Sequence, residues 1–169
     1  MWRIHNKKFI TSFTGHTNWI WCAKFSPDGK LVASCGDDKT VRVFDCTSGE
    51  CITIFSERRG MGRDLAWHPD GVIIAVALTC NRIKLFDIRA NNLIQLYRVH
   101  SMKVNSISFH PSGNYLLTAS DDNTMKILDL LEGRPIYTLT GHLSQVTSTK
   151  FTRNGDYFAT GGQDKQVSH

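Results

Sequence analysis

A histidine, a hydroxyl residue and an aspartate recur three times in this sequence with constant spacing. In the first trio, Asp38 follows His16 by 22 residues and Ser34 lies between them. Two further trios keep this spacing: His100, Thr118 and Asp122; His142, Thr160 and Asp164. Hydrolases use the same residue types, because an imidazole oriented by a carboxylate can activate a hydroxyl nucleophile. The trios therefore indicate either a nucleophilic site or a buried network whose polar groups satisfy one another.

The repetition of the trio favours the structural interpretation. Three identical catalytic triads within 169 residues would be an implausible arrangement for one enzyme. We therefore assign no catalytic residue and expect each trio to hydrogen-bond across a loop. Solvent access to Ser34 and Thr118 distinguishes the two interpretations, since a nucleophile must reach its substrate.

The trios belong to a longer repeat with a period of 42 residues. Turn glycines and segment-closing aspartates keep this period: Gly29, Gly71, Gly113 and Gly155; Asp45, Asp87 and Asp129. Four units, at about 2–43, 44–85, 86–127 and 128–169, would occupy almost the whole chain. We expect a single repeat domain over 1–169.

Each unit has the pattern of short β-strands. Val41 and Val43 alternate with Arg42, a period of two that buries one face of a strand and exposes the other. The turns SPDG, HPDG and HPSG separate such strands, because proline fixes φ and glycine permits positive φ. No helical periodicity competes with this pattern, so the predicted fold class is all-β.

A 42-residue unit with Gly-His before its first strand and an aromatic-Asp pair after its third resembles the WD40 repeat. The resemblance implies a β-propeller in which the trio forms most of the family's structural tetrad. Phe44, Phe86 and Leu128 replace the tryptophan whose indole N–H would complete that tetrad. Because WD40 proteins usually have seven blades, we expect an open fragment of a seven-bladed propeller. The alternative is a closed four-bladed ring completed by a strand over 7–13.

The second unit departs from the others in all three trio positions. Arg58 replaces the histidine, Val76 the hydroxyl residue and Cys80 the aspartate. Loss of all three is coherent, because an aspartate left alone would be a buried unsatisfied charge. We expect apolar contacts to hold this unit, mainly from Leu65, Trp67, Ile74, Val76, Ile83 and Leu85.

Apolar positions after each trio histidine predict a β-bulge at the start of the following strand. The bulge should turn the residues three and five beyond the histidine toward the loops. The predicted protein-binding face comprises these positions and neighbouring basic residues: Trp19, Trp21, Lys39, Arg59, Met61, Arg63, Arg82, Lys103 and Asn105. Tryptophan beside arginine is typical of an interface. The alternative is that the tryptophans pack against a neighbouring blade and the basic residues are merely solvated.

Composition narrows the class of partner. The chain is 41% hydrophobic and 21% charged, as in globular proteins, and its net charge of +5 favours acidic partners. No apolar run is long enough to span a membrane, and five cysteines without a C-x-x-C pair argue against disulfides or zinc. We expect no metal, cofactor or small-molecule ligand. Two tryptophans give too few stacking aromatics to favour nucleic acid.

Several segments resemble one group in particular, the centriolar WD40 proteins named for the proteome of the centriole. They are HTNWIWCAKFSPDGKL, ASCGDDKTVRVFD and FHPSGNYLLTAS, with MKILDLLEGRPIYTLTGH the most specific. The resemblance implies a non-catalytic scaffold of the cytoplasm and cytoskeleton, at centrioles and basal bodies. There it would support cilium assembly by binding centriolar proteins or tubulin. The alternative is a WD40 adaptor of another complex, such as a ubiquitin-ligase substrate receptor or an RNA-processing particle.

Overall fold

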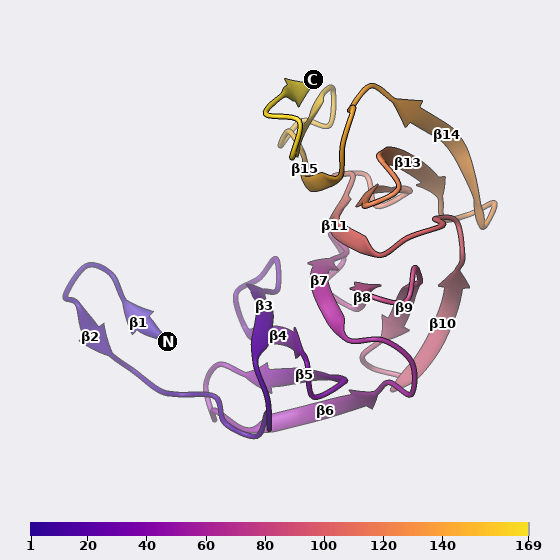
Figure 1. The fold of residues 1–169 in the computed structure, drawn as a ribbon. Helices are drawn as coiled ribbons and strands as arrows, with labels where there is room; N and C mark the ends of the chain where they lie inside the picture. Colours follow the sequence, from indigo (N-terminus) through magenta and orange to yellow (C-terminus); the bar gives the residue numbers. More distant parts are fainter. Residues whose placement is uncertain (169) are drawn as a thin grey trace.

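The computed structural model describes residues 1–168, whose regular elements are all β-strands (Figure 1). A short hairpin, β1 (Trp2–Arg3) and β2 (Lys8–Phe9), precedes four antiparallel sheets, numbered one to four in chain order. Sheet one contains β3 (Ile20–Phe25), β4 (Leu31–Gly36), β5 (Thr40–Asp45) and β6 (Cys51–Ser56). Sheet two contains β7 (Gly62–Trp67), β8 (Ile73–Leu78), β9 (Ile83–Asp87) and β10 (Asn92–Tyr97).

Sheets three and four repeat this order of strands. Sheet three contains β11 (Val104–Phe109), β12 (Tyr115–Ser120), β13 (Thr124–Asp129) and β14 (Arg134–Thr140). Sheet four contains β15 (Val146–Phe151), β16 (Phe158–Gly162) and β17 (Val167–Ser168). Consecutive strands pair in every sheet, so each sheet is a simple meander. The all-β prediction is confirmed.

The sheets follow one another along an arc (Figure 1). Their first strands β3, β7, β11 and β15 pack side by side on the concave side, and β6, β10 and β14 lie on the convex side. Strand β2 pairs with β1, and the last sheet ends on β17. The alternative in which a strand over 7–13 completes a four-bladed ring is therefore wrong for the described residues.

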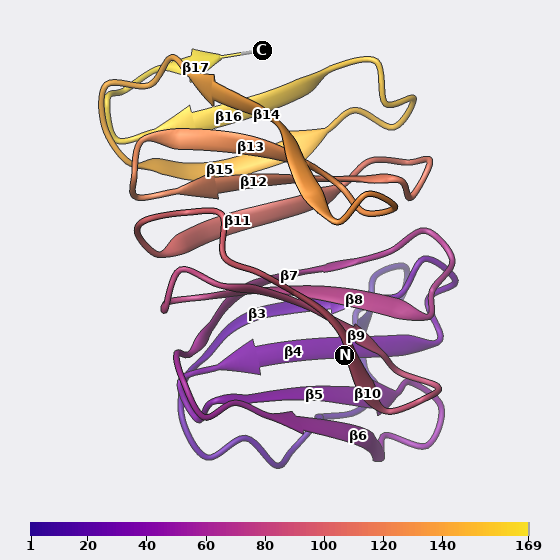
Figure 2. The ribbon, with the colours of Figure 1, turned by 90° about the vertical axis from the view of Figure 1, so that its right-hand side faces the viewer.

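Turn chemistry fixes the connections between strands. Gly29, Gly71, Gly113 and Gly155 all have φ between 73° and 84°, which glycine adopts without strain. A side chain at Gly113 would also meet His68 of the preceding sheet, whose Nε2 lies 3.0 Å from the Gly113 carbonyl oxygen. Figure 2 shows the strands from the side, with their turns gathered at the two ends of the sheets.

Apolar side chains fill the spaces between neighbouring sheets. Phe55 of sheet one stacks on Phe86 of sheet two, with ring centroids 4.3 Å apart. Between sheets two and three, Ile83, Val104 and Leu116 are fully buried. These contacts hold the arc together, since burial of each such side chain contributes about 1.5 to 3 kcal/mol.

A partly buried carboxylate joins three sheets at their inner strands. Asp64 of β7 accepts hydrogen bonds from Lys24 of β3 (2.7 Å), and from the Ser106 hydroxyl (3.0 Å) and Ile107 N–H (2.9 Å) of β11. Burial raises the pKa of Asp64, but the charge and hydrogen bond of Lys24 and the other donors outweigh it and hold the pKa below its usual range. The ionised carboxylate therefore links sheets one, two and three.

Candidate protein-interaction surface

The structure brings the members of each trio into hydrogen-bond contact. In sheet three, His100 Nδ1 lies 2.8 Å from Asp122 Oδ2, and its Nε2 lies 2.8 Å from Thr118 Oγ1. The Ser101 N–H donates to the same carboxylate oxygen over 3.1 Å. The corresponding nitrogen-to-oxygen distances in the other two trios are 2.7 to 3.0 Å. Each trio thus connects a loop to the second strand of its sheet.

Burial and hydrogen bonding set the charge state of the sheet-three trio. Burial lowers the pKa of His100, more strongly than Asp122 raises it, and so favours the neutral imidazole. Burial raises the pKa of Asp122, but hydrogen bonds from Thr124, His100 and the Ser101 N–H outweigh it and hold that pKa at about 2. A neutral His100 that donates from Nδ1 to Asp122 can accept the Thr118 O–H at Nε2.

The trio hydroxyls are inaccessible to a substrate. Ser34 is 4% exposed, Thr118 is fully buried and Thr160 is 2% exposed. A nucleophile must come within about 3 to 3.5 Å of the atom that it attacks. The trios have the hydrogen-bonding order of a hydrolase triad, but their burial favours a bracing role.

Sheet two, which lacks the trio, has a buried ion pair near the loop where the other sheets have their trio histidine. Lys84 Nζ of β9 lies 2.7 Å from both carboxylate oxygens of Glu57, whose side chain is only 3% exposed. The apolar residues expected to hold this sheet are buried, including Leu65, Ile74 and Val76. Apolar contacts alone are therefore an incomplete account of sheet two. Sequence reasoning missed Glu57, although the equivalent positions Gly15, Val99 and Gly141 are uncharged.

A β-bulge begins the first strand of every sheet, as predicted. The pairing register shifts between Ile20 and Cys22, between Gly62 and Asp64, and at the equivalent places in sheets three and four. The bulged residues are Trp21, Arg63, Asn105 and Thr147. Their side chains gather where the four inner strands begin, because the bulge removes them from the alternation of the strand.

Two tryptophans and an arginine form the aromatic part of this surface. Trp19 is 71% exposed and Trp21 is 43% exposed, with ring centroids 5.9 Å apart in an edge-to-face arrangement. Arg63 of sheet two lies over the Trp21 ring, with its Cζ 4.2 Å from the centroid. Trp21 Nε1–H also donates to Asp37. Trp21 is thus held in place by groups of two sheets, and Trp19 remains open to solvent.

The predicted positions in sheet three are engaged within the chain. Lys103 pairs with Asp121 over 3.2 Å, and Asn105 Nδ2 donates to Asp121 (2.7 Å) and to the Val146 carbonyl (2.8 Å). Lys103, Asn105 and Asp121 line a polar hollow of about 120 Å³ together with Arg63 of sheet two and with Gln145, Thr147 and Gln163. Asn105 therefore serves the junction between sheets three and four, and Lys103 presents a partly neutralised charge.

Two of the remaining predicted positions line a second hollow, and the other two lie in neighbouring segments. Arg59 and Arg82 line it together with Arg58 and with the Glu57–Lys84 pair. The nearby Lys39 has a left-handed backbone (φ 60°), and its carbonyl accepts the Glu57 N–H over 2.7 Å. Met61 is half-buried, and its N–H donates to Thr79. The predicted face thus divides into an aromatic part at the inner strands and a basic part over sheet two.

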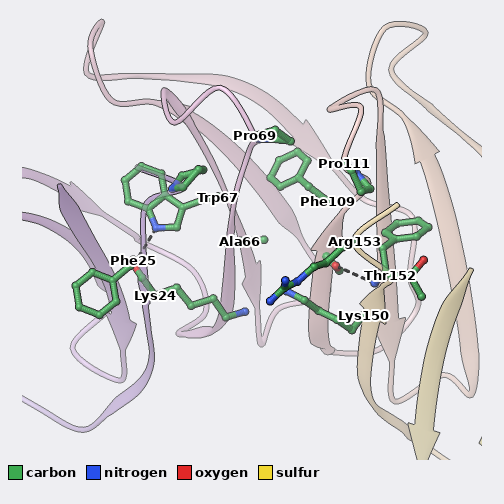
Figure 3. A pocket seen from close by; sticks show the side chains of 13 residues that line it. Lys24, Phe25, Ala66, Trp67, Pro69, Phe109, Pro111, Lys150, Thr152 and Arg153 are labelled. Carbon is green, nitrogen blue, oxygen red and sulfur yellow. Dashed lines mark hydrogen bonds between the residues drawn. The ribbon is translucent and has the colours of Figure 1, made fainter. Parts of the chain in front are cut away.

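A further hollow, which sequence reasoning missed, lies at the opposite end of the inner strands (Figure 3). Its volume is about 720 Å³, and aromatic rings 42 residues apart line it: Phe25, Trp67, Phe109 and Phe151. Lys24 and Arg153 point toward its middle (Figure 3). The periodic aromatic at the end of each first strand was the available signal.

No cluster of metal-ligating side chains occurs within residues 1–168. Burial raises the pKa of the Cys22 thiol to about 11, which keeps it protonated. No helix in the described part of the chain is long and apolar enough to cross a membrane.

Two protein-family models match this chain. The model described as "WD domain, G-beta repeat" matches residues 7–45, 91–129 and 133–169. The chain belongs to the WD40 family. A second model, "Anaphase-promoting complex subunit 4 WD40 domain", matches residues 56–105. The generic repeat model thus misses the part of this WD40 chain that lacks the trio.

Curated relatives match this WD40 chain over short segments. Apoptotic protease-activating factor 1 of Danio rerio is 38% identical over 45 residues, 27% of this chain and 4% of that protein. The probable cytosolic iron-sulfur protein assembly protein Ciao1 of Anopheles gambiae is 47% identical over 38 residues, 22% and 11% of the two chains. Nuclear distribution protein nudF 2 of Penicillium rubens is 37% identical over 57 residues, 33% and 12%.

The matches cover only 4 to 12% of the length of these relatives. Their names describe unrelated processes, so what they share with this chain is the repeat. WD40 proteins are generally non-catalytic scaffolds for protein interactions, which is the functional class that the comparisons support. They give no support to the centriolar resemblance.

Proposed function

We propose that this WD40 chain is a non-catalytic scaffold that binds a partner protein through Trp19, Trp21 and Arg63. The observation that carries the proposal is the exposed pair of Trp19 and Trp21, in which Arg63 of the adjacent sheet lies over the Trp21 ring and the Trp21 ring contacts Trp19. Aromatic side chains that are already ordered lose little conformational entropy on binding. The net charge of +5 favours a partner with an acidic surface.

Site-specific photo-crosslinking can find the partner. A photoreactive phenylalanine analogue at position 19 should capture it, and the same analogue at position 52, on the outer strand β6, should not. Ile52 is a matched control because it is 50% exposed but lies on the outer strand β6, away from the inner strand β3 that carries Trp21. The purified partner then gives a binding assay for variants.

In that assay, Trp19→Ala and Arg63→Ala should each weaken binding by at least about tenfold, as expected for residues at the centre of an interface. Ile52→Ala should bind like the unaltered chain. Equal binding by all three variants would refute the proposal.

We propose further that the chain forms part of a seven-bladed propeller, with repeat units at about 2–43, 44–85, 86–127 and 128–169. Support comes from the constant period and from an arc that does not close over the described residues. Small-angle scattering of the purified chain tests this proposal. An elongated arc is expected, and the compact profile of a closed ring would contradict it.

The cellular setting that we propose is the centriole and basal body, reached from the cytoplasm and cytoskeleton. The segment MKILDLLEGRPIYTLTGH supports this setting by resemblance. The alternative is an adaptor of another complex, and the diverse names of the relatives support it at least as well as the centriolar setting. Tagged protein in ciliated cells should concentrate at basal bodies, whereas recovery only in another complex would favour the adaptor.

If tubulin is the partner, steering by the basic residues should matter. Arg59→Glu, Arg63→Glu and Lys103→Glu together should weaken cosedimentation with microtubules, because the acidic tubulin surface would repel the reversed charges. Cosedimentation unchanged by these substitutions would exclude this docking mode.

A further inference from the structure

The basic hollow over sheet two has an excess of positive charge. It has a volume of about 350 Å³, and its lining residues are Ser56, Glu57, Arg58, Arg59, Arg82 and Lys84. Glu57 is the one carboxylate in this lining, and Lys84 contacts both of its oxygens at 2.7 Å. The pair is therefore neutral as a unit, and three guanidinium groups remain.

Those three guanidinium groups have no carboxylate partner within residues 1–168. The ion pairs found there involve other cations, and Lys84 is the one basic side chain of the hollow among them. Arg58 and Arg59 are exposed and Arg82 is half-buried, so their charges can reach a ligand. Like charges held together repel one another, and a bound anion would relieve that repulsion.

Sheet three provides an internal comparison for these positions. The equivalents of Arg58, Arg59 and Arg82 are His100, Ser101 and Thr124. All three hydrogen-bond to the carboxylate of Asp122, through an imidazole, a backbone N–H and a hydroxyl group. In sheet two, Cys80 replaces that aspartate and the three partners are arginines. At these positions sheet two therefore has three cations, where sheet three has an aspartate and three groups that hydrogen-bond to it.

Local hydrogen bonds fix the loop that carries the arginines. The Cys80 thiol donates to the Arg59 carbonyl over 3.2 Å, and the Met61 N–H donates to Thr79 over 3.0 Å. Gly60 lies so close to Cys80 that a side chain at this position would collide with its sulfur. The backbone of the loop is thus ordered before any ligand arrives, which lowers the entropic cost of binding.

We infer that this hollow binds a phosphate group carried by a partner polypeptide. A guanidinium group donates two parallel hydrogen bonds to a phosphate, and three such groups match a dianion with three terminal oxygens better than a single carboxylate. The inference rests on the proposed protein-binding function, because a partner bound at Trp19, Trp21 and Arg63 would present its phosphorylated side chain here.

Arginine side-chain NMR tests this inference. The probe is an acetylated and amidated peptide, Gly-Gly-phosphoserine-Gly-Gly, compared with its serine and glutamate versions and with inorganic phosphate. The phosphopeptide should shift the Nε–H resonances of Arg58, Arg59 and Arg82 and leave that of the exposed Arg98 unchanged. Its affinity should exceed that of inorganic phosphate, and it should fall as pH drops through about 6, where phosphate loses its second charge.

Variants locate the binding to this hollow. Arg58→Gln, Arg59→Gln and Arg82→Gln should each weaken phosphopeptide binding by about tenfold or more, and Arg98→Gln should have no effect. Unchanged melting temperatures will show that these variants are folded. Equal binding of the phosphoserine and glutamate peptides would overturn the inference in favour of an acidic-peptide site. Equal binding of phosphopeptide and inorganic phosphate would refute the inference that the phosphate belongs to a polypeptide.

The partner assay separates this inference from the proposed function. If Trp19→Ala abolishes partner binding and the three arginine variants do not weaken it, the inference fails and the scaffold function stands. If the arginine variants lose the phosphopeptide and Trp19→Ala still binds the partner, the proposed aromatic surface is wrong and the phosphate site stands.

Discussion

Sheets two and three differ in the polar groups that are buried beside their loops. At the loop end of sheet three, a neutral His100 connects Asp122 to a buried Thr118. At the same end of sheet two, a Glu57–Lys84 ion pair takes this place. The His100 trio and the Glu57–Lys84 pair each satisfy their own buried polar groups, so this place in the fold requires satisfied groups and not particular residue types. This freedom leaves sheet two able to carry exposed arginines.

The largest expected effect comes from breaking the ion pair. Lys84→Met should lower the free energy of unfolding by about 3 to 5 kcal/mol, because it leaves the Glu57 carboxylate buried without a counter-charge. Urea denaturation measures this change. Combining Lys84→Met with Glu57→Val, the residue of sheet three at this position, should restore most of the stability. A double variant as unstable as Lys84→Met would mean that the buried charge is not the cause.

Breaking the trio should have a smaller effect. His100→Ala should lower the free energy of unfolding by about 1 to 3 kcal/mol, because Thr118 and Asp122 each lose a buried hydrogen-bond partner. The matched control is His5→Ala, since His5 is exposed in the terminal hairpin. A thermal melt unaltered by His100→Ala would contradict the bracing role.

The trio should also make stability depend on pH in acid. The pKa of Asp122 is about 2 in the folded chain, below its unfolded value of about 3.9. Its contribution is complete above about pH 5 and is progressively lost as pH falls toward 2. Denaturation at several pH values should therefore show Asp122→Asn less stable than the unaltered chain near neutrality, with the difference shrinking toward pH 2. A difference that is constant with pH would argue against an ionised Asp122.

The smallest effect is expected at the sheet-three equivalent of Lys84. Lys126 Nζ donates to the exposed Thr138 hydroxyl over 2.9 Å, and within residues 1–168 it forms no ion pair with a carboxylate. Lys126→Met should change the free energy of unfolding by no more than about 0.5 kcal/mol. Urea denaturation beside Lys84→Met makes the comparison. Similar losses for the two variants would show that Glu57 does not distinguish the sheets.

The sequence was informative wherever structure depends on local chemistry. Alternating residues such as Val41 and Val43 predict strands, and Pro-x-Gly turns predict the positive φ of Gly29 and Gly71. The bulge followed from the spacing of apolar residues, because one extra residue shifts the side-chain alternation of a strand. Because these strand, turn and bulge patterns recur every 42 residues, the succession of similar sheets along the chain could also be predicted.

Contacts between side chains that are far apart in the sequence could not be predicted in this way. Glu57 and Lys84 are 27 residues apart, and each alone resembles an ordinary exposed charge. Asp64 joins three sheets only because neighbouring inner strands lie side by side. The distance between those strands depends on how the sheets pack, and the sequence of a single repeat does not specify it. The hollow near Phe25 and Phe151 depends in the same way on how the sheets are arranged along the arc.

Amide hydrogen exchange is the most direct test of whether the His100 trio of sheet three and the Glu57–Lys84 pair of sheet two stabilise their sheets independently. In sheet three, the Ser101 N–H donates to Asp122, and in sheet two the Met61 N–H donates to Thr79. His100→Ala should reduce protection at Ser101 beyond the global loss of stability and leave Met61 reduced by the global loss alone. Equal losses of protection at both amides, or none beyond the global loss at Ser101, would contradict the account.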